Sequence, residues 1–254
     1  MGKSRLFPFM EYQSLNTVRI LDEDFGGDTL STFKFNVSNG GGNSAADPVI
    51  RTGTLNGECR FVTGDAGTDA ASSDLTTGLQ MRGDRGAVVV ACLTLSSISD
   101  VKVEFGFTDA LNDAGAVLVK ADSTFTATDC ALWVLDTTDN GNWEGLGANN
   151  GTTAPMATVE AAISPTATTF EWLMVELLET DDTNSECAVV FRRFDAAGLL
   201  TFEEIGGGIE ETNAGPNSNV LLTPWLYVEA LTSSSINMDV DYFGAWQRRT
   251  ATVT

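Results

Sequence analysis

Residues 101–107 read Val-Lys-Val-Glu-Phe-Gly-Phe, in which apolar residues alternate with polar or small ones. Successive side chains of a β-strand point to opposite faces, so this pattern predicts a strand with one apolar and one polar face. The alternation assigns four residues to the core and two to the outside: Val101, Val103, Phe105 and Phe107 face inward, and Lys102 and Glu104 face outward.

The same alternation recurs at residues 33–38 and 236–242. Strands of this kind are typical of two antiparallel sheets that pack against each other. The sequence therefore predicts an all-β fold, a two-sheet antiparallel β-sandwich. Between clusters of Gly, Asn, Asp, Ser and Thr, strands are expected near residues 17–21, 33–38, 58–63, 78–82, 86–95, 100–107, 115–120, 130–135, 169–179, 187–194, 199–205, 222–231 and 236–246.

One of these segments, residues 169–179, is also compatible with a helix. Leu173, Met174, Leu177 and Leu178 have helical spacing. The strand-like segments on either side favour a long buried strand instead.

Three parts of the chain differ in composition. Residues 1–16 form an N-terminal arm, residues 17–249 hold the predicted sandwich, and residues 250–254 are a short tail. The arm combines basic and aromatic side chains, namely Lys3, Arg5, Phe7, Phe9, Met10 and Tyr12. It is expected either to dock into a partner or, equally, to close the bottom of its own sandwich, and docking is the hypothesis carried forward.

The chain is acidic, with a formal net charge of −21. Residues 100–245 carry 24 acidic and only 4 basic residues, so most of the charge lies on the body of the sandwich. Such a field repels phosphate backbones and excludes sequence-independent binding of nucleic acid by the body. We interpret the acidity as a source of solubility or of repulsion between neighbouring copies, rather than as a cation site.

The sequence contains no histidine, which is the commonest general base and a common metal ligand. We therefore expect no enzymatic activity, no catalytic residues, no cofactor and no bound metal. The four cysteines lie far apart without a C-x-x-C pair and are expected to be buried thiols: Cys59, Cys92, Cys130 and Cys187. No segment has the ~20 apolar residues of a membrane helix or the apolar run of a signal peptide, so a soluble protein made in a cytoplasm is expected.

Two glycine-rich segments imitate binding motifs. Residues 145–151 nearly match a dinucleotide-binding fingerprint, but the third glycine is displaced, and we interpret the segment as a loop. Residues 136–144 imitate the start of a calcium loop, but the twelfth position is Gly147 instead of an acid. A turn between two strands is the favoured interpretation.

Carboxylates and tryptophans supply the other candidate sites. Asp239 and Asp241 share one face of the last strand, and we interpret them as exposed polar positions, because no Glu-x-Asp-x-x-Glu array occurs. Among the tryptophans, only Trp143 in a polar Asn-Gly-Asn context is expected to be exposed. Three others lie within apolar runs and are expected in the core: Trp133, Trp172 and Trp225.

The order of several features resembles a known family. Phe-Gly-Phe-Thr-Asp at 105–109 precedes Gly-Ala-Val-Leu-Val at 115–119, a Trp-bearing strand at 133–136 and a strand at 188–194, and the chain closes on residues 236–243. This order resembles the concanavalin A-like, or laminin-G-like, jelly roll of tailed-bacteriophage virion proteins. The resemblance spans residues 17–249.

The resemblance implies a non-enzymatic virion structural protein that decorates or cements the capsid. Its implied partners are the major capsid protein or other virion proteins, with many copies or a homo-oligomer on one particle, and with neither nucleic acid nor membrane. The alternative is a carbohydrate-binding tail or fibre module that recognises a host surface. The implied location is the virion.

Overall fold

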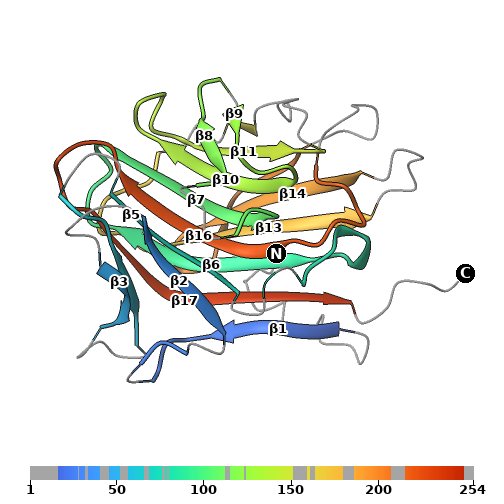
Figure 1. Cartoon of the computed structure of the whole chain (residues 1–254), viewed down its shortest axis with the longest axis horizontal. Coiled ribbons are helices and arrows are strands. Elements are labelled where there is room, and N and C mark those ends of the chain that lie inside the picture. Colours follow the sequence, from blue (N-terminus) through green and yellow to red (C-terminus); the bar gives the residue numbers. More distant parts are fainter. Residues whose placement is uncertain are drawn as a thin grey trace, which may run out of the picture.

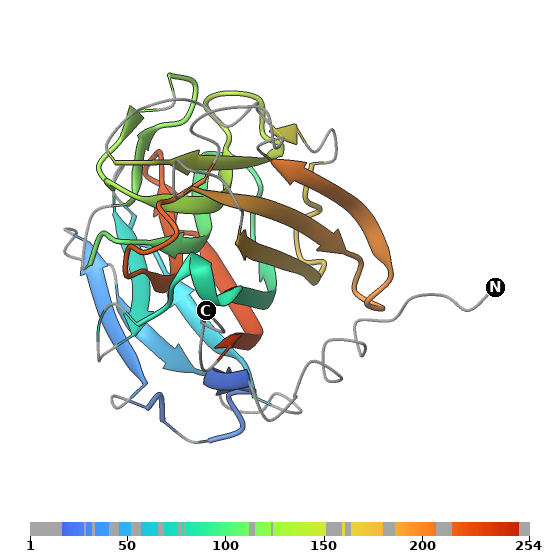
Figure 2. The ribbon, with the colours of Figure 1, turned by 90° about the vertical axis from the view of Figure 1, so that its right-hand side faces the viewer.

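The computed structural model describes residues 17–27, 29–31, 34–40, 46–51, 57–65, 69–75, 78, 80–111, 115–122, 124–150, 159–160, 164–179, 186–206 and 215–248. Two large antiparallel sheets pack face to face (Figure 1 and Figure 2), which confirms the predicted β-sandwich. The strands of the described residues begin at Thr17 and end at Arg248.

The larger sheet has eight strands. Seven of them follow one another in the order β15 (Leu200–Gly206), β14 (Cys187–Phe194), β13 (Glu171–Glu179), β6 (Val88–Leu95), β17 (Asn237–Arg248), β4 (Cys59–Val62) and β3 (Ala46–Ile50). The eighth strand, β1 (Thr17–Glu23), pairs with the second half of β17, and β4 pairs with its first half. β17 therefore connects three neighbours.

The smaller sheet has seven strands, in the order β12 (Val159–Glu160), β11 (Trp143–Ala148), β10 (Cys130–Asp136), β7 (Val101–Thr108), β16 (Thr223–Ala230), β5 (Ala70–Leu75) and β2 (Phe35–Gly40). A separate hairpin consists of β8 (Val117–Val119) and β9 (Thr124–Phe125). The one helix within the described residues is the short 3-10 helix η2 (Gly83–Arg85).

Most predicted strands are present, and the ambiguous segment 169–179 is a strand, because β13 pairs with both β6 and β14. Residues 78–82 were predicted as a strand, but Met81 makes only an isolated bridge to Leu222. The predicted loop at 145–151 is also wrong, because residues 145–148 lie in β11. Gly145 is needed there for space: a Cβ atom at this position would lie 2.6 Å from the ring of Phe191.

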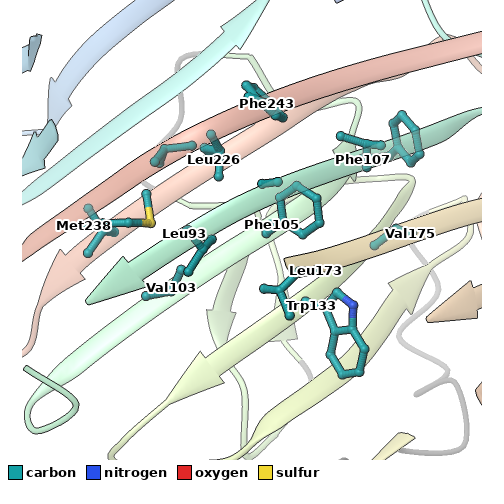
Figure 3. Packing of buried hydrophobic residues seen from close by; sticks show 14 of the residues in the cluster. Leu93, Val103, Phe105, Phe107, Trp133, Leu173, Val175, Leu226, Met238 and Phe243 are labelled. Carbon is teal, nitrogen blue, oxygen red and sulfur yellow. The ribbon is translucent and has the colours of Figure 1, made fainter. Parts of the chain in front are cut away.

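The core lies between the two sheets and contains the four residues that the sequence assigned to it. Val101, Val103, Phe105 and Phe107 are fully buried. They face the inward side chains of the larger sheet, such as Leu93 and Phe243 (Figure 3), and the rings of Phe105 and Phe243 meet edge to face at 6.4 Å. Alternation along β7 therefore predicted the inner face correctly.

The outer face of β7 differs from the prediction. Lys102 and Glu104 point away from the inter-sheet core, yet they are 3% and 0% exposed instead of facing solvent. They are covered by the β8–β9 strap, which we define as residues 115–122 and 124–127. The prediction failed because alternation within one strand says which side a residue faces, but not whether another segment covers that side.

The carboxylate of Glu104 holds the strap in place. It accepts hydrogen bonds from the backbone N–H groups of Ala116 (2.7 Å) and Val117 (2.9 Å) and from Trp225 Nε1 (3.0 Å). Lys102 Nζ lies 3.0 Å from the same carboxylate. Four donors therefore surround a fully buried charge, which is the condition under which a buried carboxylate is tolerated.

Replacing Glu104 by alanine is expected to destabilise the protein strongly. The change leaves the Lys102 ammonium buried without its partner and leaves two strap N–H groups and Trp225 Nε1 without their acceptor. Removal of one member of a buried ion pair typically costs about 3–5 kcal/mol. The free energy of unfolding from urea titration measures the effect.

A matched control is Glu203→Ala, which removes a carboxylate that is paired with Arg192 but has a 47% exposed side chain. Exposed ion pairs contribute about 0–1 kcal/mol, so this variant should remain close to the parent protein. Equal losses in the two variants would contradict the structural role assigned to Glu104.

Candidate functional site

The outer face of the larger sheet carries a group of partly exposed aromatic side chains. Trp172 of β13 and Tyr242 of β17 both lie opposite Cys92 of β6, so the three residues form one row across three strands. The rings of Trp172 and Tyr242 are 5.8 Å apart and tilted by 44°. Trp246 lies four residues further along β17, opposite Val88. We call Trp172, Tyr242 and Trp246 the aromatic face.

The aromatic face rests on an apolar floor. It consists of four nearly fully buried residues, Val88, Val90, Met174 and Phe194, and the three aromatic side chains pack against them. The ring of Tyr242 lies over Gly244, where a Cβ atom would come within 2.5 Å of the tyrosine oxygen. A glycine two residues after Tyr242 therefore leaves room for its ring.

This arrangement corrects two predictions about tryptophans. Trp172 was expected in the core but is partly exposed on the outer face. Trp143 was expected to be exposed but is fully buried, and its Nε1 donates a hydrogen bond of 2.9 Å to Glu171. The polar residues before Trp143 form the hairpin turn, whereas Trp143 itself begins β11 and points into the core. The other two core assignments, Trp133 and Trp225, are confirmed as buried.

Charged side chains flank the aromatic face on one side. The guanidinium of Arg192 on β14 contacts the carboxylates of Glu176, at 2.6 Å, and of Glu203. Burial lowers the pKa of Arg192, but the hydrogen bonds that its guanidinium donates to these two carboxylates, together with their charges, outweigh burial and raise the pKa above its ordinary value. The guanidinium therefore stays charged, with both carboxylates bound to it.

A second charged group lies on the other side, over β17 and β4. Asp239 accepts two hydrogen bonds from Arg60, at 2.7 and 2.8 Å, and one of 3.1 Å from Arg51. Arg51 also forms an ion pair with Glu58. Asp239 is only 8% exposed, so its interpretation as an exposed polar position is wrong. The side chain of Asp239 does point away from the core, but the side chains of Arg51 and Arg60 lie across it.

A β-bulge displaces the register of β17 between these two groups. Val240 lies opposite Leu93 and Tyr242 lies opposite Cys92, so Asp241 is an extra residue in the strand. Bulges re-aim side chains and are common beside functional sites. Burial raises the pKa of the Asp241 carboxyl above its ordinary value, and the charges of Glu58 and Asp24 raise it further.

The segment that imitates a calcium loop is the turn between β10 and β11, as predicted. Lys120 from the strap supplies its cation: the fully buried Nζ lies 3.2 Å from Asp139 Oδ2 and 3.1 Å from Glu144 Oε1. It also donates hydrogen bonds to Asn140 Oδ1 and to the carbonyl oxygen of Asn142. Within the described ranges, no group of His, Cys, Asp or Glu side chains is arranged to hold a metal ion.

The remaining sequence predictions have mixed outcomes. The four cysteines are buried, as expected. The proposed docking residues Lys3, Arg5, Phe7, Phe9, Met10 and Tyr12 lie outside the described residues, so the arm stays a prediction. No helix in the part of the chain that the structure describes is long and apolar enough to cross a membrane.

No protein-family model matches the chain, and no curated protein matches its sequence. Solved structures nevertheless match its fold along almost the whole length. A protein of unknown function from Shewanella oneidensis is similar with a TM-score of 0.57 at 10% sequence identity. That match covers 100% of this chain and 99% of the other.

Two further similar structures come from proteins whose names refer to carbohydrates. A β-1,3-glucanase from Mycobacterium marinum matches with a TM-score of 0.57 at 7% identity, over 90% of this chain and 99% of the glucanase. The carbohydrate recognition domain of Emp47p matches with a TM-score of 0.53 at 8% identity, over 91% and 95%. These likenesses show that the fold is a concanavalin A-like jelly roll, as the sequence resemblance implied.

The comparisons also correct the expectation that the chain has no enzymatic activity. A β-1,3-glucanase has this fold, so the scaffold itself supports catalysis. The absence of histidine does not exclude such chemistry, because hydrolysis of a glycosidic bond typically depends on a pair of carboxyl groups and not on imidazole.

Replacing Lys120 by methionine is expected to lower stability, because the carboxylate of Glu144, which is almost fully buried, loses its cation. The cost should be about 3–5 kcal/mol. The control Lys34→Met removes a lysine with a 44% exposed side chain from its ion pair with Glu23 and should change stability by less than about 1 kcal/mol. Thermal and urea unfolding measure both variants.

We expect calcium chloride to leave the Tm of the parent protein unchanged, because the ammonium group of Lys120 already occupies the oxygen cluster of the β10–β11 turn. A calcium-dependent rise in Tm that Asp139→Asn abolishes would contradict this assignment.

Proposed function

We propose that this protein binds a glycan on the aromatic face of its larger sheet. The supporting observation is the partly exposed cross-strand pair of Trp172 and Tyr242, whose rings lie 5.8 Å apart. Aromatic rings with polar groups close by suit sugars, since a pyranose offers an apolar face for stacking and hydroxyl groups around its edge. A carbohydrate recognition domain and a glucanase with the same fold agree with this proposal.

The charges around the aromatic face favour an uncharged glycan. Arg192 is bound by Glu176 and Glu203, and Arg60 is bound by Asp239. These guanidinium groups are therefore already neutralised by carboxylates of the protein. The net charge of −21 adds a repulsive field against sulfated, sialylated or uronic glycans.

Attachment to a tailed-phage particle through residues 1–16 stays a separate proposal, supported by the basic and aromatic composition of the arm. Under that proposal the location is the virion, and the partner is the major capsid protein or another virion protein. A glycan-binding face on the sandwich is compatible with such an attachment, since it belongs to a different part of the chain.

The binding proposal is tested with a fixed panel of immobilised probes: laminarihexaose as a β-1,3-glucan, cellohexaose as a β-1,4-glucan, a high-mannose oligosaccharide and mucin-type O-glycans. We expect at least one probe to bind. Trp172→Ala and Tyr242→Ala should each weaken that binding about fivefold or more, because each change removes a stacking surface worth about 1 kcal/mol or more.

The control Leu118→Ala changes a side chain that is 55% exposed on β8, away from the aromatic face, and should bind as the parent does. Sulfated laminarin should bind more weakly than laminarin. Absence of binding to all probes, or equal binding by parent and Trp172→Ala, would refute the proposal.

A further inference from the structure

A lysine, an asparagine and a glutamate meet where the β8–β9 strap touches the β10–β11 turn. Lys120 belongs to the strap, Asn140 lies in the turn, and Glu144 lies at the start of β11. The β8–β9 hairpin is drawn beside β10 and β11 in Figure 1. The side chain of Lys120 is fully buried and that of Glu144 is 5% exposed, so water has little access to the two charged groups.

The contacts within this group place an amine against the carbonyl group of a side-chain amide. Lys120 Nζ lies 3.2 Å from Asn140 Oδ1, and the Cγ atom of Asn140 is one bond away from that oxygen. The backbone N–H of Asn142 donates a second hydrogen bond, of 2.8 Å, to the same oxygen. Donors aimed at a carbonyl oxygen stabilise the negative charge that develops there when a nucleophile attacks its carbon.

Glu144 contacts both nitrogen atoms that would exchange protons in such an attack. Its Oε1 lies 3.1 Å from Lys120 Nζ and also accepts a hydrogen bond from Asn140 Nδ2. A side chain that acts as general base and then as general acid has to reach the nucleophile and the leaving group. One carboxylate oxygen reaches both here. Asp139, the other carboxylate at Nζ, has a 30% exposed side chain.

We propose that Lys120 and Asn140 join in an intramolecular isopeptide bond and that Glu144 moves the protons of this reaction. The bond is a covalent modification of the chain by itself. It does not depend on glycan binding, because its three residues lie on the strap and on the smaller sheet, away from the aromatic face.

The reaction balances without a co-reactant. Glu144 takes a proton from the ammonium group of Lys120, and the lone pair of Nζ then forms a bond to Asn140 Cγ. The second proton of Nζ passes through Glu144 to Nδ2, the bond between Cγ and Nδ2 breaks, and its electron pair leaves with the nitrogen. A lysine ammonium and an asparagine amide thus become a secondary amide and an ammonium ion. Asn140 is exposed, which gives the ammonium ion a path to solvent.

The bond fastens the strap to the smaller sheet. Within the described ranges β8 and β9 pair only with each other, and an isolated two-stranded hairpin is marginally stable in water. Lys120 and Asn140 are 20 residues apart, so the link closes a loop and lowers the entropy of the unfolded chain, as a disulfide does. The ion-paired cluster is the reactant. In the product the nitrogen of Lys120 stays among the same oxygen atoms as an amide.

Mass spectrometry of the denatured parent protein tests the proposal. We expect an intact mass that is lower, by one molecule of ammonia, than the sequence requires. Chymotrypsin cuts after phenylalanine, and Phe125 lies between the two linked residues. The digest should therefore contain two peptides joined through Lys120 and Asn140, and fragmentation of the joined pair locates the link.

Three variants identify the residues that take part. Lys120→Arg keeps the positive charge and Glu144→Gln keeps the shape of the side chain, and each should retain the full mass and give no joined peptides. Asn142→Ala is the matched control in the same turn, because it keeps the backbone N–H that contacts Asn140. It should lose ammonia as the parent does. A melting curve shows which variants are folded.

Each other outcome contradicts the proposal. A parent protein that keeps its full mass after prolonged incubation, without joined peptides, would overturn it whatever the variants do. Loss of ammonia that persists in Lys120→Arg would instead report cyclisation of Asn140 onto the backbone of Gly141. Joined peptides that have lost water and are linked through Asp139 would refute the role of Asn140. A link that still forms in Glu144→Gln would refute the role of Glu144.

Discussion

The buried carboxylate of Glu104 determines which surfaces of this sandwich are available. A jelly roll has two outer faces, one on each sheet. Where the strands of a sheet alternate between apolar and polar residues, its outer face can be open to solvent. In this protein Glu104 binds two backbone N–H groups of the strap, the indole of Trp225 and the ammonium of Lys102. The outer face over β7 and β16 is thereby closed, and Trp225 and Tyr227 are buried beneath the strap.

The opposite outer face has a different character because of β17. This strand pairs with β6 along one edge and with β4 and then β1 along the other, and a bulge at Asp241 interrupts it. Tyr242, Gly244 and Trp246 on its second half contribute to the aromatic face, whereas Asp239 on its first half binds two arginines. This one strand therefore carries Tyr242 and Trp246 of the aromatic face and, a few residues earlier, Asp239, which binds Arg51 and Arg60 of neighbouring segments.

The sequence predicted what depends on local periodicity and missed what depends on contacts between distant segments. The inward face of β7 follows from alternation, and so does the sandwich itself. The burial of Lys102 and Glu104 could not be predicted, because it depends on residues 115–127 folding back over β7. The bulge at Asp241 is likewise invisible in the sequence, since it appears only when β17 is paired with β6. Trp143 and Trp172 were assigned the wrong environments because polar or apolar neighbours in sequence do not determine which face of a strand a residue occupies.

Oxidative footprinting of the five tryptophans, with and without a bound probe glycan, tests most directly the claim that one outer face is open to a ligand and the other is closed. Trp172 and Trp246 should be oxidised rapidly in the free protein, and Trp133, Trp143 and Trp225 slowly, since the last three are fully buried. Glycan should protect Trp172 and leave the rates of the three buried residues unchanged. Rapid oxidation of Trp225, or protection by glycan that omits Trp172, would contradict the account.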